Sequence, residues 1–167
     1  MAQPFVAVVG PADADEETDR IAEETGRLLA REGAVVVCGG LGGVMEAACR
    51  GAVAGGGTTV GILPGNDRRD ANRWVTVPIA TGMGELRNGL VVTTADVVVA
   101  IGGGHGTLSE IALALRSGTP VVGLRTWIPL LPDGAADPGV LVANDPGHAV
   151  SLAMRSFARP AGRSLQG

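Results

Sequence analysis

Short apolar runs, each followed by a glycine-containing turn and a longer amphipathic stretch, recur along most of this chain of 167 residues. Apolar runs of about five residues are typical of strands buried on both faces, as the strands of parallel sheets are. The longer stretches have apolar residues at helical spacing, which is typical of helices that cover such a sheet. The pattern therefore predicts an α/β fold: a single Rossmann-like domain with a doubly wound, mainly parallel sheet and helices on both faces.

The same pattern predicts the order of the elements along the chain. We expect strands at residues 5–9, 34–38, 58–63, 74–77, 97–101, 120–123 and 140–142. We expect helices at residues 16–31, 44–54, 83–95, 107–117 and 146–157. The Rossmann-like nucleotide-binding domain is then residues 1–157, and residues 158–167 are expected to form a flexible C-terminal tail.

The chain has no lysine and no tyrosine, and its 13 basic residues are all arginine. A P-loop and a Schiff base to pyridoxal phosphate both need a lysine, so the sequence excludes both, including any pyridoxal-dependent lysine decarboxylase. We expect no required cofactor. The two cysteines, Cys38 and Cys49, are expected to be small buried hydrophobic residues, and with only two histidines we expect no metal site.

The net charge of the chain is −4 at pH 7, which argues against binding to nucleic acid through overall charge. The sequence has no recognisable N-terminal signal segment and no apolar stretch of about 18 residues. We therefore expect a cytoplasmic protein whose partners are neither nucleic acids nor membranes.

Three glycine-rich turns follow predicted strands, so all three are expected at the carboxyl edge of the sheet, where doubly wound folds bind ligands. Glycine lets a ligand approach the backbone, and the helix after each turn presents unpaired N–H groups to an anion. The turns predict a site for a phosphate-bearing small molecule, although each one could also be only a tight turn. Their glycines are Gly10, Gly39, Gly40, Gly42, Gly43, Gly102, Gly103, Gly104 and Gly106.

The last of these turns leads into Thr107 and Glu110. Its spacing disfavours NAD, because Thr107 stands where the dinucleotide fingerprint has a third glycine and no acid near residue 124 is placed to bind a ribose. Thr107 and Glu110 allow two interpretations. They have the spacing of a helix capping box, and they would also lie beside a phosphate, where Glu110 could orient water or a ribose hydroxyl.

Three further side chains are candidates. His105 either lines the site or faces solvent. Arg87 and Asn88 lie in a mostly uncharged stretch, where an isolated arginine indicates an anionic partner. The alternative for Arg87 is a surface position beside Glu85.

Three motifs, in this order, resemble the LOG-type superfamily, which includes cytokinin-activating phosphoribohydrolases and molybdenum-cofactor carrier proteins. They are GGLGGVME at residues 39–46, MGELRN at residues 83–88 and GGGHGTLSE at residues 102–110. The similarity extends over residues 5–157, which is nearly the whole chain. The motif combination is specific for the superfamily and much less specific for one activity.

The resemblance implies roles for several of these residues. Arg87 and Glu110 would be a catalytic pair that cleaves the N-glycosidic bond of a nucleoside 5′-monophosphate, with the 5′-phosphate on the turn that ends at Thr107. Met45, Asn88 and His105 complete the expected ligand-binding residues. The resemblance also implies a homodimer, with the helix that carries the arginine near the interface.

Two departures from the phosphoribohydrolase pattern favour the carrier branch. Gly102 stands where those enzymes have proline, and Asn88 where they have lysine. Two functions therefore stay open: a nucleoside 5′-monophosphate phosphoribohydrolase, and a non-catalytic carrier of molybdenum cofactor or a related nucleotide. In both cases the partner is a phosphate-bearing small molecule, either a nucleotide or a pterin-type cofactor.

Overall fold

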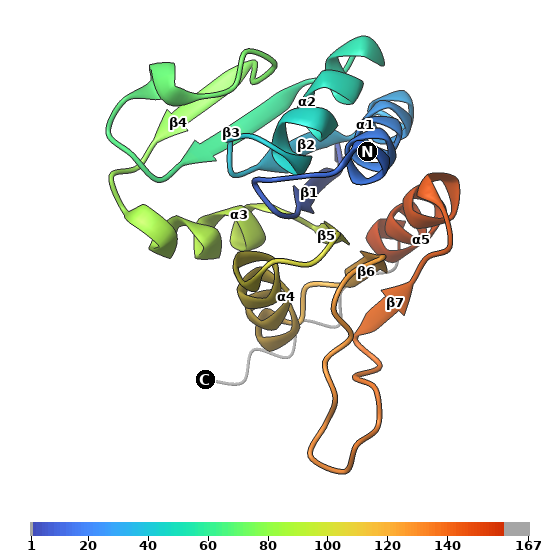
Figure 1. Cartoon of the computed structure of the whole chain (residues 1–167). Helices are drawn as coiled ribbons and strands as arrows, with labels where there is room; N and C mark the ends of the chain where they lie inside the picture. Colours follow the sequence, from blue (N-terminus) through green and yellow to red (C-terminus); the bar gives the residue numbers. More distant parts are fainter. Residues whose placement is uncertain (1, 159–167) are drawn as a thin grey trace.

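Seven short strands, most of them rich in valine, pair side by side in one sheet in the computed structural model, which describes residues 2–158 (Figure 1). Their order is β4-β3-β2-β1-β5-β6-β7, and every neighbouring pair is parallel. The strands are β1 (Phe5–Val9), β2 (Val35–Cys38), β3 (Thr59–Leu63), β4 (Val77–Ala80), β5 (Val97–Ile101), β6 (Val121–Leu124) and β7 (Val140–Val142). The predicted fold class is confirmed.

Five helices cover the two faces of this sheet. They are α1 (Glu16–Arg31), α2 (Val44–Ala54), α3 (Asn88–Thr94), α4 (His105–Ser117) and α5 (Pro146–Ala158), and two short 3₁₀ turns are η1 (Arg68–Asp70) and η2 (Gly84–Arg87). Along β1, Val6 and Val8 pack with α1, α2 and α5, whereas Ala7 and Val9 pack with α3 and α4. This alternation places one apolar core on each face of the sheet.

The order of the strands determines where the sheet can bind a ligand. From β1 the chain moves to β2, β3 and β4 on one side, and it then returns to β5, β6 and β7 on the other. The loops at the carboxyl ends of β1 and β5 therefore lead to opposite faces of the sheet, and ligands of doubly wound folds bind at such a point. No helix within residues 2–158 has both the length and the apolar character that a membrane span requires.

The strand expected at residues 74–77 is wrong: β4 begins at Val77 and continues through Pro78. Before it, the Asn72 N–H donates to the Gly40 carbonyl at 2.9 Å, and the Trp74 N–H donates to the Asn72 side chain at 3.0 Å. These bonds hold the segment as a turn. Proline is tolerated in β4 because an edge strand has one side without ladder partners.

The helix expected at residues 83–95 is wrong in its first turn. Gly84 has φ = +58°, which an α-helix does not allow, and the chain forms the 3₁₀ turn η2 before α3 begins at Asn88. Helix α4 begins two residues earlier than predicted, at His105. Of the expected tail, Ala158 ends α5, and residues 159–167 lie outside the described residues.

Candidate functional site

The three glycine-rich turns meet around Pro11, as their position after parallel strands predicts. The Pro11 carbonyl accepts the Val44 N–H at 3.1 Å, which ties the first turn to the start of α2. A Cβ placed on Gly102 would lie 3.2 Å from Pro11 Cδ, and one on Gly104 would lie 3.6 Å from Pro11 Cβ. The turns after β1, β2 and β5 therefore lie next to one another at the edge of the sheet.

Helices α2 and α4 both lack a side-chain cap, but among the described residues only α4 has no acceptor for any of its first three N–H groups. The Asp15 side chain caps α1 by accepting the Thr18 N–H at 2.7 Å, and α2 gives its first N–H to Pro11. Helix α4 follows Gly104 without a side-chain cap, and within residues 2–158 the N–H groups of residues 105–107 have no acceptor. Its positive dipole end and these donors suit a phosphate.

Thr107 adds a hydroxyl to this helix end. It is the third residue of α4 and not the N-cap, so the capping-box interpretation is wrong. The side chain is only 2% exposed, and Oγ1 has no hydrogen-bond partner among the described residues. Oγ1 is directed to the turn, 3.8 Å from the position of a Cβ on Gly104. A buried hydroxyl without a partner is costly, so a ligand oxygen here would satisfy it.

Arg87 lies at the same edge of the sheet, beside the end of β2. Its guanidinium lies against Gly39 at the end of β2, where a Cβ would be only 2.6 Å from Arg87 Cζ. The residue is 7% exposed, and its Nε–H has no acceptor in the described part of the chain. Burial lowers the pKa of Arg87, while Glu110 and Cys38 oppose that effect, and a guanidinium remains charged. The surface alternative for Arg87 is therefore excluded.

Glu110 is buried on α4, one turn after Thr107, and is 7% exposed. Burial raises the pKa of this carboxyl to about 7, although the positive charge of Arg87 lowers it in part. No ion pair or hydrogen bond joins Arg87 to Glu110 in residues 2–158. Arg87 and Glu110 are thus two buried ionisable groups that interact electrostatically but form no ion pair. Such groups are common where a ligand binds.

Several other predicted ligand-binding residues have evident structural roles. Gly10 packs tightly, since a Cβ there would lie 2.6 Å from Val44 Cβ, and the Gly40 N–H donates to Cys38 Sγ at 3.3 Å. Met45 packs with the two cysteines, which are buried and free, as expected for Cys38 and Cys49.

The remaining predicted residues lie closer to the site. Gly42 and Gly43 form the turn before α2, and Gly103 and Gly106 flank the start of α4. Asn88 is half-buried and follows Arg87 directly, whereas His105 is exposed at the first position of α4.

Gly102, in the turn after β5, has a left-handed backbone conformation. Its φ is +72°, a value that proline cannot adopt. Phosphoribohydrolases of the family have proline at this position. Proline could not form the turn that Gly102 forms here.

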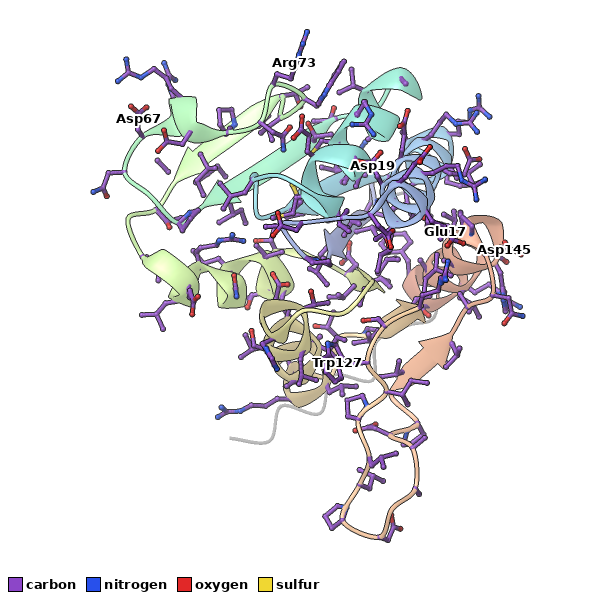
Figure 2. The ribbon with its side chains drawn as sticks, viewed as in Figure 1. Glu17, Asp19, Asp67, Arg73, Trp127 and Asp145 are labelled. Carbon is purple, nitrogen blue, oxygen red and sulfur yellow. The ribbon has the colours of Figure 1, made fainter. Side chains whose placement is uncertain are left out.

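Trp127 also lies at the candidate site, which the sequence did not indicate. It follows β6, and its indole N–H donates to the Gly104 carbonyl at 3.1 Å, so the ring lies beside the start of α4 (Figure 2). Its ring centroid is 6.1 Å from that of His105. The available signal was its position just after a buried strand, in a chain with only two tryptophans.

A cavity of about 440 Å³ lies elsewhere, between α1 and α5. It shares no lining residue with the glycine-rich turns, and most of its lining side chains are apolar. Two of the three buried polar side-chain atoms that lack partners among the described residues, Arg87 Nε and Thr107 Oγ1, belong to residues that contact the turns, and the candidate site is therefore placed there.

Comparison with known proteins identifies the relatives of this chain. The SLOG cluster4 family matches residues 3–150. An uncharacterised protein of Archaeoglobus fulgidus is 46% identical over 121 residues, which is 72% of this chain and 79% of that protein. The molybdenum cofactor binding protein of Rippkaea orientalis has a TM-score of 0.84 at 35% identity, covering 95% of this chain and 99% of that one. The molybdenum cofactor carrier protein of Chlamydomonas reinhardtii has a TM-score of 0.82 at 35% identity, covering 95% and 100%.

The raised pKa of Glu110 predicts a specific dependence of stability on pH. The folded chain holds this proton up to about pH 7, whereas the unfolded chain loses it near pH 4.5. Wild-type stability is therefore reduced as the pH rises through this window, by about 3 kcal/mol in total, and Glu110→Gln lacks this loss. Urea unfolding of both proteins across the window measures the difference. Glu85→Gln, at an exposed glutamate of η2, controls for the loss of a carboxylate, and parallel curves for wild type and Glu110→Gln would contradict the prediction.

Proposed function

Because the chain belongs to the SLOG cluster4 family, we propose that it binds a phosphate-bearing, pterin-type cofactor and acts as its carrier. The two proteins described above, named as molybdenum cofactor binding and carrier proteins, each resemble it over 95% of its length. The comparison supports this class of ligand, and the site supports the way in which it would be bound.

One observation carries the proposal: Thr107 Oγ1 is buried and without a described partner at the uncapped N-terminus of α4. Together with the unpaired N–H groups of that helix, the hydroxyl forms a set of donors for a phosphate. Arg87 offers a second, buried positive group at the end of β2 for another anionic or carbonyl group of the ligand. A cofactor with a phosphate at one end and further polar groups at the other fits both.

The proposal predicts opposite effects of Thr107→Val on binding and stability. Valine keeps the shape of threonine but removes the hydroxyl, so affinity for guanosine 5′-monophosphate should fall about tenfold. The free protein should be at least as stable as wild type, because a buried hydroxyl without a partner has been removed. Titration calorimetry and thermal unfolding measure the two effects. Thr107→Ser keeps the hydroxyl and should bind like wild type; a destabilised Thr107→Val that still binds fully would refute the assignment.

A phosphoribohydrolase is the second candidate, and the buried pair Arg87 and Glu110 favours it. A carboxyl with a pKa of about 7 suits acid–base catalysis at neutral pH. In that reaction water adds to C1′ of the ribose, the N-glycosidic bond breaks, and the base leaves with a proton. The left-handed Gly102 and the Asn88 substitution argue against it.

Incubation with a panel of nucleoside 5′-monophosphates distinguishes the two functions. A carrier binds members of the panel and releases no ribose 5-phosphate from any of them. Release that Glu110→Gln abolishes, while binding persists, would establish the hydrolase and overturn the carrier proposal.

We further propose that the protein is a homodimer in which a second copy covers the β4 side of the molecule. Large apolar side chains are exposed there on β4, η2, α3 and the segment between them, and Leu86 is 77% exposed. Such a patch beside an unpaired edge strand is typical of a protein interface. The side chains are Val77, Ile79, Met83, Leu86 and Leu90.

Leu86→Glu is expected to convert the dimer to a monomer, because it places a charge in the apolar interface. Sedimentation equilibrium of wild type and variant measures this change. Leu130→Glu is the matched control, since Leu130 is 69% exposed on the segment that projects between β6 and β7 (Figure 1). A monomeric wild type, or a Leu86→Glu variant that stays dimeric, would be evidence against this interface.

A further inference from the structure

Trp127 and His105 form an exposed aromatic pair on the glycine-rich turn at α4. The ring centroids are 6.1 Å apart with an interplanar angle of 30°. A Cβ on Gly103 would lie 3.4 Å from the indole nitrogen, so the ring contacts the turn itself. Trp127 is 39% exposed, in a chain whose composition is only 2% aromatic.

The position of the tryptophan is fixed from two directions. Its N–H donates to the Gly104 carbonyl at 3.1 Å, which orients the ring without covering all of it. Two residues earlier, Arg125 has φ = +56°, the one left-handed non-glycine residue among those described, and its side chain pairs with Glu17 at the start of α1. A strained backbone that is tied down beside a ligand site is characteristic of a positioned functional side chain.

The aromatic pair and the arginine lie on opposite sides of the phosphate-binding turn. Arg87 lies against Gly39 after β2, whereas Trp127 follows β6, and β1 and β5 lie between these two strands. The site therefore has a charged side toward β2 and an aromatic side toward β6, with the uncapped N-terminus of α4 between them.

We propose that Trp127, supported by His105, stacks on the planar heteroaromatic ring of the ligand whose phosphate binds at α4. The proposal rests on the proposed carrier function and adds where the ring lies. Its indole nitrogen already has an acceptor, so the remaining exposed surface of the side chain is apolar and suits a flat ring. Stacking on such a surface tolerates different rings, because every base or pterin has a π face.

Two probes separate ring binding from phosphate binding. Guanosine 5′-monophosphate carries a guanine that shares the 2-amino-4-oxopyrimidine ring of pterins, and ribose 5-phosphate has the phosphate without the ring. In Trp127→Ala the affinity for guanosine 5′-monophosphate should fall about tenfold, whereas the affinity for ribose 5-phosphate should be unchanged. Trp127→Phe keeps an aromatic ring and should retain most of the affinity.

Fluorescence reports the same contact with Trp127 in place. Trp74→Phe leaves Trp127 as the single tryptophan of the chain. Guanosine 5′-monophosphate should then quench its emission, and ribose 5-phosphate should not.

Each other outcome has a distinct meaning. If wild type binds neither probe, the proposed function itself fails. If wild type binds both and Trp127→Ala leaves guanosine 5′-monophosphate binding unchanged, the ring lies elsewhere and only this inference is overturned. Equal loss of both probes in Trp127→Ala would show that Trp127 only holds the turn in shape, which also overturns it.

Discussion

The parallel pairing of β1 with β5 at the centre of the sheet is the constraint on which the rest of the structure depends. Val6–Val9 of β1 pair with Val97–Ala100 of β5, and every one of these residues is buried. Because the chain leaves the two strands for opposite faces, their carboxyl ends cannot be covered by a common helix. The turns after β1 and β5 are left at this edge, and α4 begins there with its N–H groups unpaired.

The balance of charge at this edge follows from that geometry. The positive end of α4 and the Arg87 guanidinium both favour an anion, and burial raises the pKa of Glu110 to about 7, so this carboxyl is only partly charged at neutral pH. Thr107 Oγ1 and Arg87 Nε lack partners within residues 2–158, so the free protein bears a cost that a ligand would remove. These features support the proposed binding of a phosphate-bearing molecule, and Trp127 adds an aromatic surface beside the turn.

The parts of the fold and site that local pattern determines were predictable from the sequence. Buried valine runs and glycine-rich turns located most strands and placed the turns at one edge, where the structure shows them around Pro11. Thr107 and Glu110 were predicted as a pair, but their spacing alone could not separate a cap from a buried site. That distinction depends on where α4 begins, which the left-handed Gly102 and the extended Gly104 decide.

The features that depend on tertiary contacts could not be predicted from the sequence. The start of β4 depends on bonds from Asn72 and Trp74, and nothing local signals that Pro78 lies in an edge strand. Trp127 belongs to an irregular segment, and only its contact with Gly104 brings it to the site.

A crystal structure of the protein with guanosine 5′-monophosphate tests the central claim most directly. We expect the phosphate at the N-terminus of α4, within hydrogen-bond distance of Thr107 Oγ1 and the N–H groups of residues 105–107. A phosphate bound away from this helix end, with Thr107 Oγ1 still without a partner, would contradict the account.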